Sequence, residues 1–223
     1  PHAYAPPPFE PERSGRRRTR IAAVLKNIYC LEGDWWNDPK RPSTVRPIFD
    51  LLAQAYPNLR YVHRSIGTRE EFDHALDCWT QKKYADFPIL YFAFHGNPNI
   101  LYVGDRRRRK GKVPLEAISE VLAGHCHNRI IHFGSCKTLQ SSPDALRNFV
   151  KRTRALAVSG YRLDINWLLS ASFEVYLLGV IQESPLNLRG ATQMLERIRE
   201  VSRPLAHQLG FRMLLREGRP RAS

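Results

Sequence analysis

Apolar runs and amphipathic segments alternate along this chain, and the alternation predicts strands and helices in turn. The strongest run, residues 87–94, is apolar and aromatic throughout, which is typical of a central parallel strand covered on both faces. A second buried strand is predicted over residues 129–133. Further strands are predicted over residues 21–29, 59–66 and 155–159, a small hairpin over 100–103 and 113–115, and either an edge strand or a helical tail over 211–215.

The segments between these runs carry helix signals. Thr68 is followed three residues later by Glu71, which is the capping-box pattern of a helix N-terminus. Ser43 is a candidate N-cap for an earlier helix, with Pro47 in its first turn. Helices are predicted over residues 43–55, 68–83, 115–123, 142–152, 166–182 and 191–208. Strands that alternate with helices predict an α/β fold of three layers, a mostly parallel sheet of about six strands with helices on both faces.

Length and composition favour one folded domain. The chain has 223 residues, 43% of them hydrophobic, which is enough for one substantial core, and we expect a single domain over residues 19–223. Residues 1–18 contain three consecutive prolines and an arginine cluster with little apolar content, so they are expected to form a disordered arm. No apolar run reaches the roughly 18 residues that span a bilayer, and the sequence does not start with a signal-peptide pattern. We therefore expect a cytoplasmic protein without membrane association.

The formal net charge of +14 is concentrated in three clusters, residues 13–20, 106–112 and 212–221. Such a balance attracts acidic partners and polyanions. No nucleic-acid-binding module is recognisable, and the basic clusters lack interleaved aromatic residues. Nucleic-acid binding is therefore expected to be weak and non-specific at most.

The sequence predicts neither a metal site nor a cofactor. The spacing of the four cysteines does not indicate a disulfide framework, so reduced thiols are expected. A group of His and Cys residues invites a metal interpretation, but its spacing fits no common zinc pattern. The members of this group are His125, Cys126, His127, His132 and Cys136. No glycine loop of the phosphate-binding or dinucleotide-binding kind is present either.

Two of the most apolar predicted strands end on polar residues of a catalytic type. Residues 87–94 lead into His95 and Gly96, and residues 129–133 lead into Gly134-Ser135-Cys136. Adjacent parallel strands would place both ends at the same edge of the sheet, where α/β proteins bind ligands. A cysteine nucleophile needs a nearby base, and histidine is suited to that role near neutral pH. The backbone N–H groups of Gly96 and Cys136 are candidates for an oxyanion hole.

This arrangement resembles the caspase-like superfamily of cysteine peptidases, which includes caspases, metacaspases, separase and clostripain. The segment between the two strand ends is most similar to the bacterial CHAT-domain peptidases: a hairpin over residues 100–105 that ends in Gly-Asp, a Leu-rich helix over 115–122, and then the cysteine strand over 130–136. The helix and strand that follow, ending at residues 158–161, also match. The resemblance covers roughly residues 20–185 and implies a three-layer caspase-like fold.

The resemblance implies that Cys136 is the nucleophile and His95 the general base and acid of a cysteine endopeptidase, often without a third orienting side chain. It implies a protein or peptide substrate and leaves open a regulatory protein partner. The residues around the cysteine depart from the family, since they match neither the caspase Gln-Ala-Cys pattern nor the metacaspase Asp-Ser-Cys pattern. The alternative is a catalytically inactive caspase-like scaffold or regulatory module whose basic surface binds acidic partners or nucleic acid.

In this superfamily the loops after the first and fifth strands help to form the substrate pocket. Here these loops offer Asp34 and Asp164, and an acid at the base of the pocket would favour Arg or Lys before the cut. Arg162, two residues from Asp164, argues against this interpretation, and either acid is also compatible with a surface or capping position. Trp167 is a candidate for a substrate subsite or for core packing.

Overall fold

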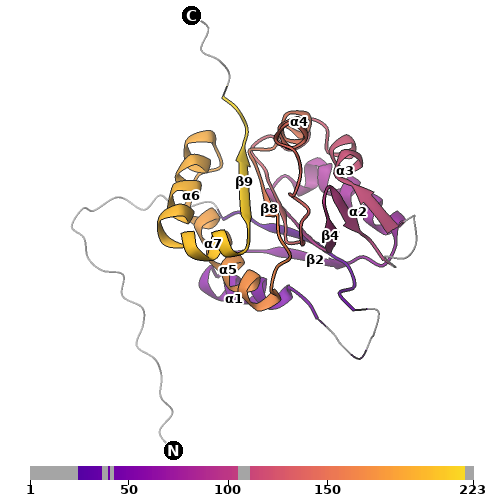
Figure 1. Cartoon of the computed structure of the whole chain (residues 1–223), viewed down its shortest axis with the longest axis horizontal. Coiled ribbons are helices and arrows are strands. Elements are labelled where there is room, and N and C mark those ends of the chain that lie inside the picture. The colour runs from indigo at the N-terminus through magenta and orange to yellow at the C-terminus, as the bar shows by residue number, and fades with distance from the viewer. Residues whose placement is uncertain (1–24, 37–39, 41–42, 105–110, 219–223) are drawn as a thin grey trace, which may run out of the picture.

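The structure is a computed structural model that describes residues 25–36, 40, 43–104 and 111–218. The arm expected over residues 1–18, most of the basic cluster at 106–112 and the end of the last cluster lie outside these ranges. Within them the chain forms a three-layer α/β fold, with one main sheet between two layers of helices (Figure 1).

The main sheet has six strands in the order β2-β1-β3-β7-β8-β9, and only the last pairing, β8 with β9, is antiparallel. The predicted sheet of about six mostly parallel strands is therefore confirmed, and residues 211–215 form the edge strand rather than a helical tail. The strands are Ile28–Glu32 (β1), Tyr61–Ser65 (β2), Ile89–Ala93 (β3), Ile130–Phe133 (β7), Ala157–Tyr161 (β8) and Phe211–Leu215 (β9).

Helices cover both faces of this sheet, as Figure 1 shows. One face packs against Arg69–Thr80 (α2), Leu115–Val121 (α3) and Pro143–Thr153 (α4). The other face packs against Arg46–Ala55 (α1), Trp167–Glu183 (α5), Leu188–Val201 (α6) and Arg203–Gln208 (α7). A short 3₁₀ helix, Lys82–Tyr84, follows α2. No helix in the described ranges is both long and apolar enough to cross a membrane.

The continuous apolar run of β3 follows from its position between the two helical layers. Successive side chains of a strand point to opposite faces, so a strand covered on both sides must be apolar at every position. Leu90 and Phe92 lie in the core that faces α2, whereas Ile89, Tyr91 and Ala93 lie in the core that faces α5. All five side chains are fully buried.

Two local predictions differ from the structure, and a third is confirmed. The first strand was expected over residues 21–29, of which 21–24 lie outside the described ranges. Among the described residues, β1 begins at Ile28 and runs to the charged residue Glu32. The last helix was expected to be continuous over 191–208, but it ends at Val201, and α7 starts again with Pro204 in its first turn. The capping box at Thr68 and Glu71 is confirmed, since both of its hydrogen bonds are present.

The predicted hairpin is part of a small antiparallel sheet of three strands. These are His95–Asn97 (β4), Ile100–Tyr102 (β5) and Lys112–Pro114 (β6). The His-Gly segment was expected to be a strand end, but it forms the first strand of this second sheet. His95 is opposite Tyr102, and Gly96 is opposite Leu101. The backbone around His95 is therefore fixed by pairing and not left in an open loop.

Candidate active site

The structure brings His95 and Cys136 together at one edge of the main sheet. Strands β3 and β7, which lead into them, pair in parallel, with Phe92 opposite Phe133. Both residues lie in the wall of a cavity of about 330 Å³ at the carboxyl ends of these strands. The adjacency of the two strand ends predicted from the sequence is therefore confirmed.

Gly96 packs directly against the loop that carries Cys136. A Cβ atom at Gly96 would lie 2.1 Å from the hydroxyl oxygen of Thr138 and 2.5 Å from the carbonyl oxygen of Cys136. Both separations are too short for any side chain, so only glycine allows the two segments to touch. The close approach holds the backbone of Gly96 against that of the cysteine loop.

The imidazole of His95 is oriented by the backbone of the loop after β1. Its Nε2 lies 2.6 Å from the carbonyl oxygen of Trp35, and the Trp35 ring contacts the imidazole edge-to-face at 5.4 Å. A carbonyl oxygen can only accept, so Nε2 must carry the hydrogen, and in the neutral ring the lone pair is at Nδ1. This partner could not be predicted from the sequence, because a backbone carbonyl is present at every position.

Trp35 is in turn anchored to the buried carboxylate of Glu32 at the end of β1. The Trp35 indole N–H donates to Oε1 at 2.6 Å, and the Val45 backbone N–H donates to the same oxygen at 2.9 Å. Thr44 and His63 contact the other oxygen. Burial alone would raise the pKa of Glu32, but the hydrogen bonds from these four residues together lower it.

Hydrogen bonds also hold the cysteine loop against the segment after β8. The backbone N–H of Ile165 points at the Cys136 sulfur, 3.5 Å away, which puts a hydrogen-bond donor beside this thiol. The Lys137 backbone N–H donates to the Leu163 carbonyl at 3.0 Å. Lys137 itself has a φ of 56°, a left-handed conformation that is uncommon for a residue other than glycine. The chain therefore turns sharply immediately after Cys136.

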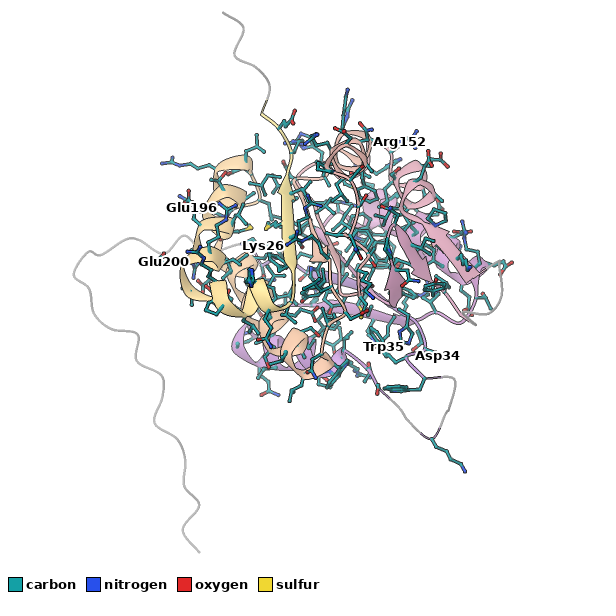
Figure 2. All side chains as sticks on the ribbon, viewed as in Figure 1. Lys26, Asp34, Trp35, Arg152, Glu196 and Glu200 are labelled. Carbon is teal, nitrogen blue, oxygen red and sulfur yellow. The ribbon has the colours of Figure 1, made fainter. Side chains whose placement is uncertain are left out.

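The two acids expected to form a substrate pocket lie outside the cavity wall. Asp34 is exposed, and Figure 2 shows it beside Trp35 in the loop after β1. The carboxylate of Asp164 is largely exposed and forms an ion pair with Lys137. Trp167 does line the cavity, together with Trp35 and Trp36, so the structure places this expected subsite residue near Cys136.

A different acid, Glu174 of α5, lies in the cavity wall and was missed in the sequence. It is 2% exposed and accepts hydrogen bonds from the hydroxyls of Tyr91 (2.5 Å) and Tyr161 (2.9 Å) and from Nε2 of His132 (3.2 Å). Burial and the negative charge of Glu174 raise the pKa values of both tyrosines well above the usual range. The available signal was an acidic residue inside an otherwise apolar helix.

Comparison with known protein families matches residues 25–215 to a family described as "Family of unknown function (DUF6642)". The chain belongs to this DUF6642 family. The match runs from just before β1 to the end of β9, so it includes the whole main sheet and the cavity. No curated protein matches the chain.

Cys136 differs from the other three cysteines of this DUF6642 member in its exposure. All four are free thiols, and Cys30, Cys78 and Cys126 are buried whereas Cys136 is partly exposed. Burial raises the pKa of Cys126 to about 12 and that of Cys30 well above its ordinary value.

Among the described residues, no three His, Cys, Asp or Glu side chains are grouped so that they could hold a metal ion.

Proposed function

We propose that the chain is a cysteine endopeptidase of the caspase-like type, in which Cys136 attacks a peptide carbonyl and His95 acts as general base and then acid. The observation that carries this proposal is the shared cavity of the two side chains, where the imidazole is oriented by the Trp35 carbonyl. This hydrogen bond fixes the tautomer whose Nδ1 lone pair is able to accept a proton.

The proposed reaction has two stages. In the first, His95 takes the thiol proton of Cys136, and the sulfur forms a bond with the carbonyl carbon of the substrate. Collapse of the tetrahedral species breaks the C–N bond, and the imidazolium of His95 gives its proton to the leaving amine. In the second stage, His95 takes a proton from water and the hydroxide attacks the thioester carbon. The C–S bond then breaks, the carboxylic acid product leaves, and the imidazolium returns its proton to the Cys136 thiolate. The Trp35 carbonyl would favour the imidazolium by accepting its Nε2–H.

The developing oxyanion needs donors, and the backbone N–H groups of Gly96 and Cys136 are the candidates. The contact between Gly96 and the cysteine loop supports this assignment, because it keeps both backbone segments beside the nucleophile.

The cavity has a volume of about 330 Å³, which is enough for one substrate side chain but not for a longer segment of the substrate. Four free thiols are typical of a reducing compartment, so we extend the proposal to a cytoplasmic enzyme.

The test combines turnover with covalent labelling. A fluorogenic peptide panel with Arg, Lys, Asp or Leu before the cut reports turnover, and a peptidyl chloromethyl ketone reports a competent nucleophile. We expect label on Cys136 by peptide mapping, loss of turnover in Cys136→Ala, and slower labelling in His95→Gln. An absence of both turnover and Cys136 labelling would overturn the proposal in favour of a non-catalytic scaffold, whose basic surface would bind acidic partners or nucleic acid. Labelling without turnover would indicate an enzyme that requires an activator.

A further inference from the structure

The cavity beside Cys136 contains a buried carboxylate that the proposed chemical steps do not use. Glu174 projects from α5 into the same wall as Cys136 and His95, and it is 2% exposed. Removing a carboxylate from water is costly unless its charge is compensated. The contacts of Glu174 therefore show what a ligand of this cavity has to supply.

The hydrogen bonds of Glu174 satisfy most of its oxygen lone pairs without neutralising its charge. Tyr91, Tyr161 and His132 provide three donors, whereas a carboxylate offers about four acceptor positions. The Ser159 hydroxyl lies 2.9 Å from Nδ1 of His132 and is able to donate to it. The Nε2 atom of His132 then faces Glu174 as the donor of that hydrogen bond.

No lysine or arginine in the described part of the chain forms an ion pair with Glu174. The described residues that line the cavity include no lysine or arginine either. A negatively charged substrate side chain would therefore meet a carboxylate and no lysine or arginine. A positively charged one would supply the counter-ion that the buried carboxylate lacks.

The remaining walls also suit an organic cation on an aliphatic stem. Three tryptophans, Trp35, Trp36 and Trp167, line the cavity, and indole rings attract guanidinium and ammonium groups. Val45 and Ile165 add apolar surface against which the methylene groups of an arginine or lysine can pack. Aromatic walls and a buried carboxylate together form a site that recognises both the charge and the stem.

We infer that Glu174 determines specificity by binding the cationic side chain of an Arg or Lys residue directly before the scissile bond. This inference rests on the proposed peptidase function and assigns its substrate class. The charge-pairing role that the sequence placed on Asp34 or Asp164 belongs instead to an acid on α5.

The first test compares substrates that differ only in charge. Peptides with arginine or citrulline, and with lysine or norleucine, before the cut form two matched pairs of nearly equal size. For the unmodified enzyme we expect kcat/KM to be at least about 10-fold higher for each charged member. Glu174→Gln should reduce both ratios to about one, because turnover of the charged peptides should fall much more than turnover of their neutral partners. Asp34→Asn and Asp164→Asn are the matched acid controls and should leave both ratios unchanged.

The second test measures binding without turnover. In Cys136→Ala, N-acetyl-arginine amide should quench tryptophan fluorescence and raise the melting temperature more than N-acetyl-citrulline amide does. In Cys136→Ala combined with Glu174→Gln this difference should disappear. Tyr161→Phe removes a donor to Glu174 from a residue outside the cavity wall, and the arginine preference should survive there. This control separates loss of the charge from disturbance of the network.

The two tests distinguish failure of the inference from failure of the proposed function. Turnover with equal rates for arginine and citrulline would overturn the role of Glu174 and leave the peptidase proposal intact. Absence of turnover and labelling, with arginine amide still bound in preference to citrulline amide, would overturn the peptidase proposal and keep the cation site. Equal binding of the two amides to Cys136→Ala would overturn the cation site even if Glu174→Gln failed to fold.

Discussion

The imidazole Nε2 of His95 donates a hydrogen bond of 2.6 Å to the carbonyl oxygen of Trp35, a residue 60 positions away in the sequence. The candidate base is therefore oriented by a backbone group and not by the carboxylate of a third residue. Substitution of the Trp35 side chain cannot remove this acceptor. The position of the carbonyl depends on whatever holds the loop, and the indole N–H of Trp35 is bound to Glu32.

We expect Glu32→Gln to lower both stability and activity, because the neutral amide loses charge-assisted hydrogen bonds to the loop that carries Trp35. Loss of these bonds should lower the free energy of unfolding by about 1–3 kcal/mol at pH 7. The folded-state pKa of Glu32 is lowered. The stabilisation that the Glu32 carboxylate gives to the folded state is therefore fully present above the unfolded-state pKa of about 4.3. It is lost as the pH falls through the folded-state pKa of Glu32.

Urea unfolding of the wild type and Glu32→Gln at pH 7 and at successively lower pH would measure this dependence. The difference between the two proteins should shrink as the solution becomes acidic. Glu200→Gln is the matched control, since Glu200 lies exposed on α6 (Figure 2) and its loss should change stability by less than about 0.5 kcal/mol. An equal difference at every pH would show that the charge of Glu32 is not what anchors the loop.

Gly96→Ala should move the cysteine loop, because the new Cβ would overlap the Cys136 carbonyl oxygen and the Thr138 hydroxyl. A displacement of about 1 Å at a reacting group costs on the order of 100-fold in rate, and we expect a loss of that size in kcat/KM. Adding Thr138→Ala should not restore activity, since the clash with the carbonyl remains. Gly179→Ala is the control: its Cβ would have no neighbour closer than 3.8 Å, and the change should stabilise α5 by up to about 1 kcal/mol.

Native-state alkylation should modify Cys136 before the other cysteines. Cys30, Cys78 and Cys126 are buried, and the pKa of Cys126 is about 12, so its reactive thiolate form is scarce at neutral pH. Iodoacetamide at pH 7.5 followed by peptide mapping would give the order of modification. Initial labelling at Cys78 would contradict the arrangement, and unfolding in urea should make all four thiols equally accessible.

Arg129 should contribute more to the free energy of unfolding than a charged residue in an exposed ion pair does. Its guanidinium donates to the carbonyl oxygens of Trp79 (2.9 Å) and Tyr84 (3.3 Å) and lies 4.4 Å from the Trp79 ring centroid. We expect Arg129→Ala to cost about 2–3 kcal/mol and Arg129→Lys nearly as much, because lysine lacks the planar two-donor fork. Arg60→Ala, which breaks an exposed ion pair with Asp86, should cost about 1 kcal/mol or less. Thermal unfolding of the three variants would test this ranking.

The sequence predicts the sheet well because its strands are covered on both faces. Residues 87–94 are apolar or aromatic at every position, residues 129–133 include the apolar Ile130, Ile131 and Phe133, and both segments form paired central strands. Thr68 and Glu71 similarly locate the start of α2, since a capping box depends only on local spacing. The position of β1 was wrong because Glu32 resembles a loop residue, although the structure buries it with hydrogen-bond partners.

The sequence predicted only those residues of the candidate site whose reactive side chains directly follow a buried strand. His95 and Cys136 could be found from the ends of β3 and β7. The Trp35 carbonyl could not, because it is a backbone group brought close by tertiary structure. Glu174 lies in a helix that is apolar on nearly all sides, so the pattern does not indicate which face meets the cavity.

The strands lie across the main sheet almost in the order in which a ribosome makes them. Strand β2 joins one side of β1 and β3 joins the other side, and β7, β8 and β9 then each join the strand of this sheet made just before them. Every new strand therefore finds a partner already in place. The cavity is completed in the same order, from Trp35 through His95 and Cys136 to Glu174. A chain still under synthesis thus carries the proposed nucleophile, Cys136, before it carries Glu174, the acid proposed to select a substrate.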